Sequence, residues 1–323
     1  MDEARDQQKE SSAKPEPQTA QVLQPAPEPP DFGDKMTAFF IGADGLRAGW
    51  RFVAYVVLVV AVAIVLSLGT HFLLHSVAHK IPKIWGYLIG ESTMLVAAIV
   101  PALVFSKFEK RPFGAYGLPR RGAFGRLFWV GALWGLAAIT LLLVVMHLAG
   151  AFYFGGMALS GVRILKFAAF WGFFFLVVGF FEEFVARGYS QFTLTQGMGF
   201  WPAAILLSVL FGALHIGNQG EAWVGALSAG LIGFFFCFTL RRTGTLWFAV
   251  GMHAAWDWGE SFLYSVPDSG EMSPGHLLNS SFHGPAWLTG GSVGPEGSVL
   301  VFVLIALLWI AFDRVFPDAK YGV

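Results

Sequence analysis

Charge and cysteine are both scarce in this sequence. Lys and Arg number 21 and Asp and Glu number 21 among 323 residues, so charged residues make up 13% of the chain and cancel to a net charge of zero. Nucleic-acid-binding domains carry a basic surplus, and its absence here excludes a nucleic-acid partner. The single cysteine, Cys237, excludes a disulfide framework and a thiolate metal cluster, since each needs several cysteines.

Apolar residues are abundant instead. Hydrophobic residues make up 55% of the chain and aromatic residues 16%. A helix needs about 20 apolar residues to cross the ~30 Å hydrocarbon core of a bilayer, and eight runs meet this requirement. We therefore predict an all-α fold, a polytopic membrane helical bundle of about eight transmembrane helices. The runs are Phe52–His75, Ile84–Ser106, Leu127–Gly150, Phe167–Thr195, Phe200–Ile216, Trp223–Leu240, Thr245–Tyr264 and Val299–Phe316.

The chain before the first run differs in composition. Residues 1–45 are rich in Pro, Gln and Glu, and so little apolar surface cannot offset the entropy of ordering, which predicts a disordered N-terminal tail. Residues 46–323 form the predicted membrane domain. Most Lys and Arg residues fall on the cytoplasmic side if the N-terminus is cytoplasmic. We therefore expect a multi-pass protein of a bacterial inner (plasma) membrane, with both termini in the cytoplasm and membrane lipid as a partner.

Most ionisable side chains within the predicted membrane runs gather in one third of the chain. Each costs several kcal/mol in a bilayer, so each is a hypothesis for a functional site. The rise of ~1.5 Å per residue places these side chains in the middle band of the membrane. The candidates among them are Glu182, Glu183 and Arg187 in the fourth run, His215 in the fifth, and His253 and Asp257 in the seventh.

The spacing of these residues predicts which of them meet. Residues four apart share a helix face, so we expect Glu183 to pair with Arg187 and His253 to lie beside Asp257. Adjacent residues on a helix are turned by about 100°, so Glu182 and Glu183 are expected not to face the same partner. Arg187 would then hold Glu183 ionised, while Glu182 points elsewhere and can act as a general base.

The residues form three motifs that occur in order on separate predicted helices: Glu182-Glu183-x-x-x-Arg187, Phe211-x-x-x-His215 and His253-x-x-x-Asp257. Together they resemble the CPBP family of intramembrane metalloproteases, the CAAX-prenyl-protease-like and bacteriocin-processing enzymes that are also called Abi proteins. The resemblance implies an endopeptidase that hydrolyses a peptide bond of a membrane-associated protein or peptide within the membrane plane. Residues 166–264 would form its catalytic core.

The resemblance also implies roles for individual residues. The implied catalytic residues are Glu182, Glu183, Arg187, His215, His253 and Asp257. Glu182 would be the base, with Glu183 and Arg187 as its support. His215 would orient water or bind a metal, and the seventh run would complete the site.

A divalent metal, Zn²⁺, is the cofactor that this donor set favours. Its implied ligands are Glu182, His215, His253 and Asp257. Two imidazoles and a carboxylate suit Zn²⁺ with an open water position. Without a metal, Glu182 and His215 would polarise water while His253 steadies the oxyanion. An ionised Asp257 cannot donate a hydrogen bond to an oxyanion, which favours the metal.

Two other functions fit the same residues. In a proton-coupled transporter, buried Glu, His and Asp side chains form a relay, but such folds often carry inverted repeats and broken helices, which this sequence lacks. A non-catalytic membrane scaffold or immunity protein would keep the fold without the reaction. Loss of peptide cleavage when Glu182 is replaced by Ala would separate the protease from both.

The remaining polar residues of the membrane runs are expected to have structural roles. His71, His75 and His79 are spaced four apart, and solvated interfacial histidines explain them better than a metal stripe. Glu91 and His147 stand alone in their runs. We expect each to be a packing partner rather than part of the site.

Overall fold

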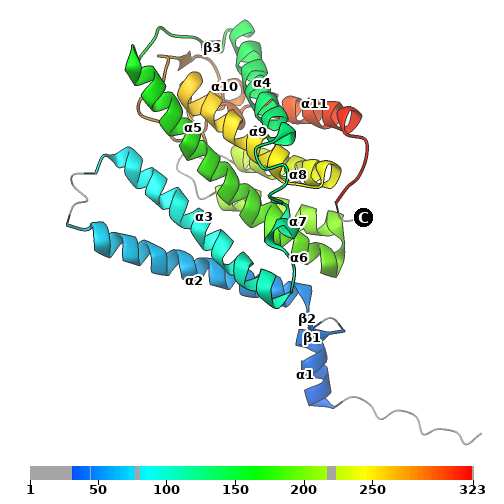
Figure 1. The fold of residues 1–323 in the computed structure, drawn as a ribbon. Coiled ribbons are helices and arrows are strands. Elements are labelled where there is room, and N and C mark those ends of the chain that lie inside the picture. The colour runs from blue at the N-terminus through cyan, green and yellow to red at the C-terminus, as the bar shows by residue number, and fades with distance from the viewer. Residues whose placement is uncertain (1–30, 44, 77–80, 217–222, 322–323) are drawn as a thin grey trace, which may run out of the picture. The chain divides into compact units, whose positions relative to one another are not determined.

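The computed structural model confirms the predicted all-α class, because helices account for most of the chain that it describes (Figure 1). Chain contacts divide the protein into two units, Met1–Ala43 and Asp44–Val323. The described residues are 31–43, 45–76, 81–216 and 223–321.

The first unit contains one short helix within the segment predicted to be disordered. Residues 1–30 lie outside the described residues, whereas α1 spans Phe32–Phe40 and strand β1 spans Ile41–Gly42. Asp31 caps the helix, since its Oδ1 accepts a hydrogen bond of 2.7 Å from the Asp34 amide. The segment predicted as the tail, residues 1–45, thus includes one short helix near its end.

Each of the eight predicted membrane runs contains a helix in the second unit. Among the described residues, five helical segments are long and apolar enough to cross a membrane, so the chain is a multi-pass membrane protein: α2 (Ala48–Leu74), α3 (Lys83–Phe108), α4 (Arg126–Leu148), the continuous segment Val162–Met198 and α8 (Trp223–Thr243). The other three runs form shorter helices: α7 (Phe200–His215), α9 (Trp247–Trp258) and α11 (Leu300–Val315).

Two helices contain a π-helical turn that the sequence did not predict. The continuous segment consists of α5 (Val162–Glu183), the π-turn η4 (Phe184–Gly188) and α6 (Tyr189–Met198). A second π-turn, η5 (Gly259–Leu263), continues α9. Single π-turns inside α-helices occur frequently at functional sites. Here η4 overlaps the first motif, and η5 begins two residues after the third motif ends at Asp257.

Helix α9 lies at the centre of the bundle, between α4 and α5 (Figure 1). Glycines allow the α4 and α9 backbones to touch, because a Cβ at Gly131 or Gly135 would overlap the carbonyl oxygen of Phe248 or Met252. In the opposite direction, a Cβ at Gly251 would overlap the backbone of α4. This close approach fixes the height and rotation of α9.

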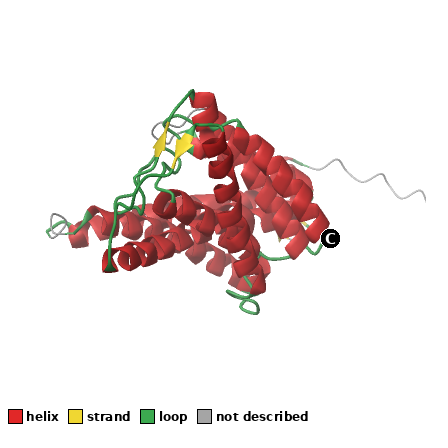
Figure 2. Cartoon of the chain, turned by 90° about the horizontal axis from the view of Figure 1, so that it is seen from above, coloured by secondary structure: helices red, strands yellow, loops and turns green. Residues whose placement is uncertain are grey.

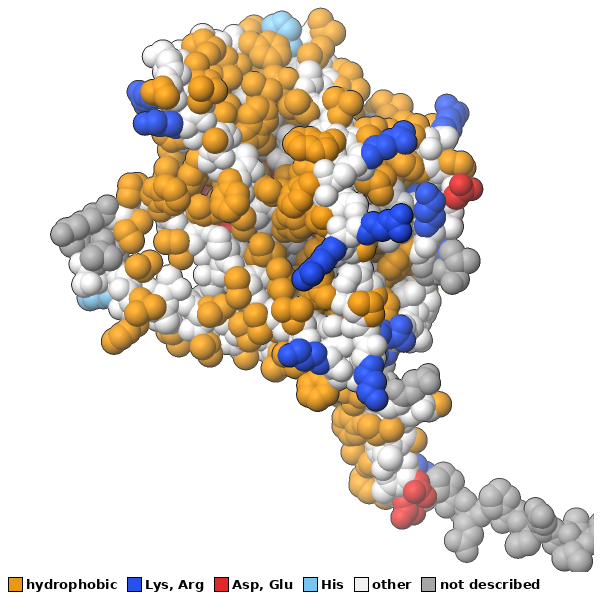
Figure 3. Space-filling model, viewed as in Figure 1, with side chains coloured by type: hydrophobic (Ala, Val, Ile, Leu, Met, Phe, Trp, Pro, Cys, Tyr) orange, Lys and Arg blue, Asp and Glu red, His pale blue; other side chains and the backbone are white. Residues whose placement is uncertain are grey.

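The pair formed by α2 and α3 is packed more loosely. Helix α3 contacts α5, and α2 contacts α6. Among the residues of α2, Ala48 and Tyr55 are the buried ones. Hydrophobic side chains cover most of the face in Figure 3, while Lys and Arg gather mainly toward one end. Such a surface is suited to lipid along the helices and to water at their ends.

A long loop after η5 folds back onto the bundle. The strands β3 (Phe152–Tyr153) and β4 (Ser281–Phe282) pair antiparallel, and Figure 2 shows short strands among loops at one side of the helices. Ser228 Oγ of α8 donates a 2.8 Å hydrogen bond to the carbonyl oxygen of Glu296. The remaining short elements are β2 (Gly45–Leu46), η3 (Phe113–Tyr116), α10 (Ala286–Thr289) and η6 (Pro295–Gly297).

Candidate active site

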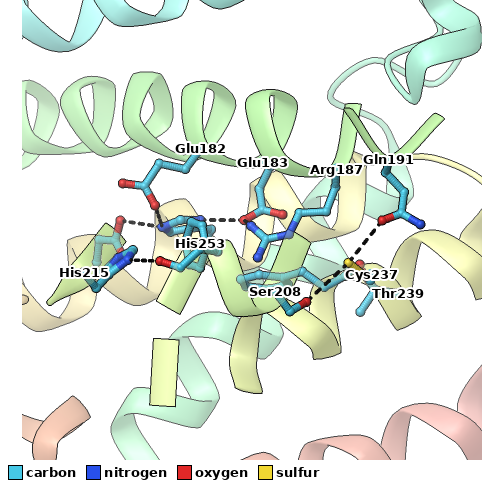
Figure 4. Close-up of polar contacts among 12 residues, drawn as sticks. Glu182, Glu183, Arg187, Gln191, Ser208, His215, Cys237, Thr239 and His253 are labelled. Carbon is cyan, nitrogen blue, oxygen red and sulfur yellow. Dashed lines mark hydrogen bonds and ion pairs between the residues drawn. The ribbon is translucent and has the colours of Figure 1, made fainter. Parts of the chain in front are cut away.

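His253 is the meeting point of the predicted carboxylates. Its Nδ1 lies 3.0 Å from Glu183 Oε1, and its Nε2 lies 3.7 Å from Glu182 Oε2 and 3.5 Å from Asp257 Oδ2. Figure 4 shows both glutamates extending from one helix toward this imidazole. The predicted proximity of His253 and Asp257 is confirmed. The expectation that Glu182 and Glu183 would not face the same partner is wrong, because the ring presents one nitrogen to each of them.

The Glu183–Arg187 ion pair forms as predicted from the four-residue spacing. Arg187 Nη1 lies 3.0 Å from Glu183 Oε1, and both side chains are fully buried. The guanidinium also lies over the Phe211 ring, with Cζ 4.2 Å from the ring centroid, which adds a cation–π contact. A Cβ at Gly233 would overlap Arg187 Nη2, so only glycine leaves room for the guanidinium there.

His215 approaches the group from the end of α7. Its Nδ1 lies 2.8 Å from the Phe211 carbonyl oxygen (Figure 4). A carbonyl oxygen only accepts, so Nδ1 carries a proton, and in a neutral ring the lone pair is then on Nε2. This tautomer suits a water-orienting or metal-binding group.

A cavity of about 540 Å³ connects the predicted residues. Glu182, His215, His253 and Asp257 all line it, whereas Glu183 and Arg187 lie behind its wall. Large apolar side chains form much of the remaining wall: Trp171, Phe174, Phe175, Ile232, Phe236 and Leu304. Ligand sites commonly combine a mostly apolar wall with a few converging polar groups.

Several further carboxylates line the cavity. Glu91 of α3 is among them, so the expectation that it lies apart from the site is wrong. Asp268, Glu271 and Glu296 of the long loop line it too. Glu91 stood alone in its run, and the loop residues lay outside every membrane run, so spacing could not connect them to the motifs.

The carboxylates of the loop affect one another. Burial, together with the neighbouring charges of Asp257 and Glu296, raises the pKa of Asp268 well above its usual range. Glu260, in η5, is fully buried at the same place. Glu260 was detectable from the sequence, because it is an ionisable residue inside the seventh predicted run, three positions after Asp257.

The other polar residues mostly behave as expected. His147 Nδ1 lies 2.8 Å from the carbonyl oxygen of Phe152, which makes it a packing partner. The rings of His71 and His75 meet edge to face, 5.7 Å apart. His79 lies outside the described residues.

Two groups of side chains offer donor atoms that could hold a metal ion. Ligand bonds of ~2.0–2.1 Å at tetrahedral angles place two ligand atoms of a zinc ion roughly 3.3 Å apart, and His253 Nε2 lies near this distance from Asp257 and Glu182. The donor chemistry thus fits Zn²⁺. Within the described part of the chain, however, the one trio whose ligand atoms all lie within 4.8 Å of one another is Glu260, Asp268 and Glu296.

Comparison with known protein families gives a match over the part of the chain that holds the three motifs. Residues 164–259 match the family described as type II CAAX prenyl endopeptidase Rce1-like. The match confirms the predicted resemblance to CAAX-protease-like enzymes. No curated protein matches the chain.

Proposed function

Starting from the family match over residues 164–259, we propose that the protein is an intramembrane endopeptidase that hydrolyses a peptide bond of a membrane-associated protein or peptide. One observation supports this most strongly. Glu182, His215, His253 and Asp257, from three separate helices, line a single cavity with largely apolar walls. The cavity offers a base and imidazoles to a substrate in surroundings from which bulk water is largely excluded.

Glu182 is the proposed general base. Its side chain is 26% exposed and its Oε2 faces His253 at 3.7 Å, too far for a hydrogen bond that would occupy the lone pair. Glu182 takes a proton from water while the water oxygen attacks the carbonyl carbon of the substrate. The proton then passes to the amine nitrogen as the C–N bond breaks, so the products are a carboxylic acid and an amine and Glu182 regains its starting state.

His253 is the proposed donor to the oxyanion. Glu183 accepts the hydrogen bond from Nδ1 and so fixes the orientation of the ring. A proton on Nε2, balanced by the charge of Asp257, then stabilises the negative oxygen of the tetrahedral intermediate. Arg187 acts through Glu183 and is a positioning residue.

His215 shares the placement of water with Glu182. Its Nδ1–H is held by the Phe211 carbonyl, so the Nε2 lone pair accepts a hydrogen bond from the attacking water. A water held by two acceptors has its oxygen lone pairs directed toward the remaining space, where the substrate carbonyl binds. This arrangement accounts for a histidine at the end of α7.

We further propose that a divalent metal, Zn²⁺, assists the reaction. The ligands would be Glu182, His215, His253 and Asp257, and the bound ion would supply Lewis-acid chemistry. Element analysis of the purified protein tests this, with His253→Ala as the variant expected to lower the zinc content. The steps above are an alternative to this metal-assisted route and describe the side chains without the ion, because a His253 Nε2 that bound the ion would not carry the proton for the oxyanion.

The substrate class follows from the walls of the cavity. Aromatic and aliphatic side chains of α5, α8 and α11 suit an extended apolar segment. A prenylated C-terminus, a bacteriocin precursor and a membrane-protein segment each present such a surface. A library of these three peptide classes in detergent micelles distinguishes them by which class is cleaved.

The experiment that tests the function compares two carboxylate variants. Glu182→Gln removes the base and is expected to lower the cleavage rate by about 10²- to 10⁴-fold. Glu271→Gln is the matched control, because Glu271 lines the same cavity without belonging to a motif. Intact cleavage by folded Glu182→Gln would contradict the proposal and favour a scaffold or transporter.

A further inference from the structure

Three carboxylates meet where the long loop folds back against the end of α9. Glu260 lies in η5, Asp268 in the loop that follows, and Glu296 in η6. One oxygen from each lies within 4.8 Å of the oxygens of the other two. The family match ends at residue 259, so this acidic trio lies outside the matched segment.

Glu260 points to a missing partner. Its side chain is completely buried, and although the side chain of Trp256 lies close to it, neither of its oxygens makes a hydrogen bond of ordinary geometry. A buried carboxylate without a partner costs several kcal/mol if it is ionised, so it requires a proton or a cation. The carboxyl group faces the two other acids, which makes a bound cation the better explanation.

The other two acids are held in place by serine hydroxyls. Ser261 Oγ donates to Asp268 Oδ2 at 3.2 Å. Ser269 donates to Glu296 Oε2 twice, from its amide at 3.2 Å and from its hydroxyl at 3.0 Å. These bonds orient Asp268 and Glu296 but occupy only one oxygen of each.

Neither Lys nor Arg balances the acids from the adjoining cavity. The described residues that line it include Asp257, Asp268, Glu271 and Glu296 but neither Lys nor Arg. His253 also lines the cavity, but its ring nitrogens contact Glu182, Glu183 and Asp257 rather than the trio.

We propose that Glu260, Asp268 and Glu296 bind a divalent cation of the oxygen-preferring class, Ca²⁺ or Mg²⁺. All three donors are carboxylate oxygens, which hard cations prefer, whereas zinc favours nitrogen and sulfur. The hydroxyl of Ser261 or Ser269 and water would complete the coordination. The site is separate from the zinc site proposed above and shares no ligand with it.

The cation would fasten the loop to the catalytic helix. Glu260 lies three residues after Asp257, on a neighbouring face of the same helix, while the other two ligands belong to the loop. The backbone already brings the loop segments together, since Gly294 has a φ of 103° and a Cβ there would overlap the Pro267 carbonyl oxygen. A cation at this point would hold Asp257 and the loop wall of the cavity in register.

Thermal unfolding of the full-length protein in detergent tests the proposal. After removal of divalent ions with EDTA, Ca²⁺ and Mg²⁺ are added separately, and Tm is followed by tryptophan fluorescence. At least one of them is expected to raise Tm in a saturable way, and the half-saturating concentrations rank the two ions. The absence of a shift with either ion at about 10 mM, above the range of weak extracellular calcium sites, would overturn the proposal.

Variants of the trio test whether these three carboxylates cause the rise in Tm with the cation. Glu260→Gln and Asp268→Asn should each raise the half-saturating concentration more than about tenfold, and the second variant carries the test if the first does not fold. Glu271→Gln is the matched control and should leave it unchanged. An equal effect of Glu271→Gln would mean that the cation binds elsewhere and would also overturn the proposal.

This test is independent of proteolysis. Glu182→Gln should keep the full response to the cation, because Glu182 belongs to the catalytic wall and not to the trio. Loss of the response in this variant would place the cation at the catalytic carboxylates and contradict a separate site. A protein without protease activity but with the response would refute the proposed function alone.

Discussion

Glu183 and Glu260 are equally buried, yet their surroundings are opposite. Both side chains are 0% exposed. Glu183 Oε1 lies 3.0 Å from Arg187 Nη1 and 3.0 Å from His253 Nδ1, whereas neither oxygen of Glu260 makes a hydrogen bond of ordinary geometry. Burial alone therefore does not reveal how a charge is compensated. The chain supplies a counter-ion for Glu183, whereas the described residues place no basic side chain within 4.0 Å of the Glu260 carboxylate.

Removing the counter-ion of Glu183 should have the largest effect. Arg187→Met leaves the buried carboxylate with His253 alone, and we expect the free energy of unfolding to fall by about 3–5 kcal/mol. Denaturant unfolding in detergent, followed by circular dichroism, measures this. Asp313→Asn is the control, because the Arg242–Asp313 pair is largely solvated, with Asp313 55% exposed, and should lose less than about 1 kcal/mol. Equal losses in the two variants would mean that burial does not make the Glu183–Arg187 ion pair more important for stability than the Arg242–Asp313 pair.

Replacing each glutamate by methionine should change stability in opposite directions. In EDTA, Glu260→Met removes a buried group that lacks a partner, and we expect stabilisation of about 1–4 kcal/mol. Glu183→Met leaves the buried Arg187 without its carboxylate partner and should destabilise the protein. The same unfolding assay compares the two variants. A loss of stability in both would show that Glu260 is compensated within the chain.

Displacing the guanidinium without removing it should have a smaller effect. Gly233→Ala places a methyl group where Arg187 Nη2 lies, and such overpacking typically costs about 1–3 kcal/mol. The cleavage rate should also fall, because the movement of Arg187 disturbs Glu183 and the ring of His253. Gly69→Ala in α2 is the control, since nothing lies within 4 Å of its Cβ position. A neutral Gly233→Ala would mean that Arg187 adjusts freely.

The smallest effect should come from the serine that orients Glu296. Ser269→Ala removes the hydroxyl donor but keeps the amide donor, so we expect a loss of about 0.5–1.5 kcal/mol. The loss should be clearer with the cation present than in EDTA, because an oriented Glu296 matters most when it binds. Tm under both conditions measures this difference. The same loss with the cation and in EDTA would show that Ser269 does not contribute to cation binding.

The helices were predictable from the sequence because the bilayer imposes one strong requirement. A membrane helix must present a long apolar run, and α2, α3, α4 and α8 follow such runs to within a few residues. The π-turns were not predictable, since they preserve hydrophobicity and change only the hydrogen-bond register. The loop from 265 to 298 has no apolar period, so its return to the cavity depends on tertiary contacts alone.

The candidate site was predictable where partners lie on one helix. Spacing predicted the Glu183–Arg187 pair and the proximity of His253 and Asp257, because residues four apart meet on any helix. The contact of His253 with both Glu182 and Glu183 depends on how α9 packs against α5. Glu91 belongs to α3, and its approach to the cavity is likewise set by packing between helices.

Two helices that line the cavity, α9 and α3, are packed against their neighbours in different ways. Helix α9 touches α4 through backbone atoms, so it cannot retreat without breaking that contact. Helix α3, which lines the cavity with Gly86, Tyr87, Gly90 and Glu91, rests on α5 beside a partner helix that buries few side chains. The cavity thus has two unlike sides: α9, which carries the imidazole, is in direct backbone contact with α4, whereas α3 buries only small residues, three alanines and a proline.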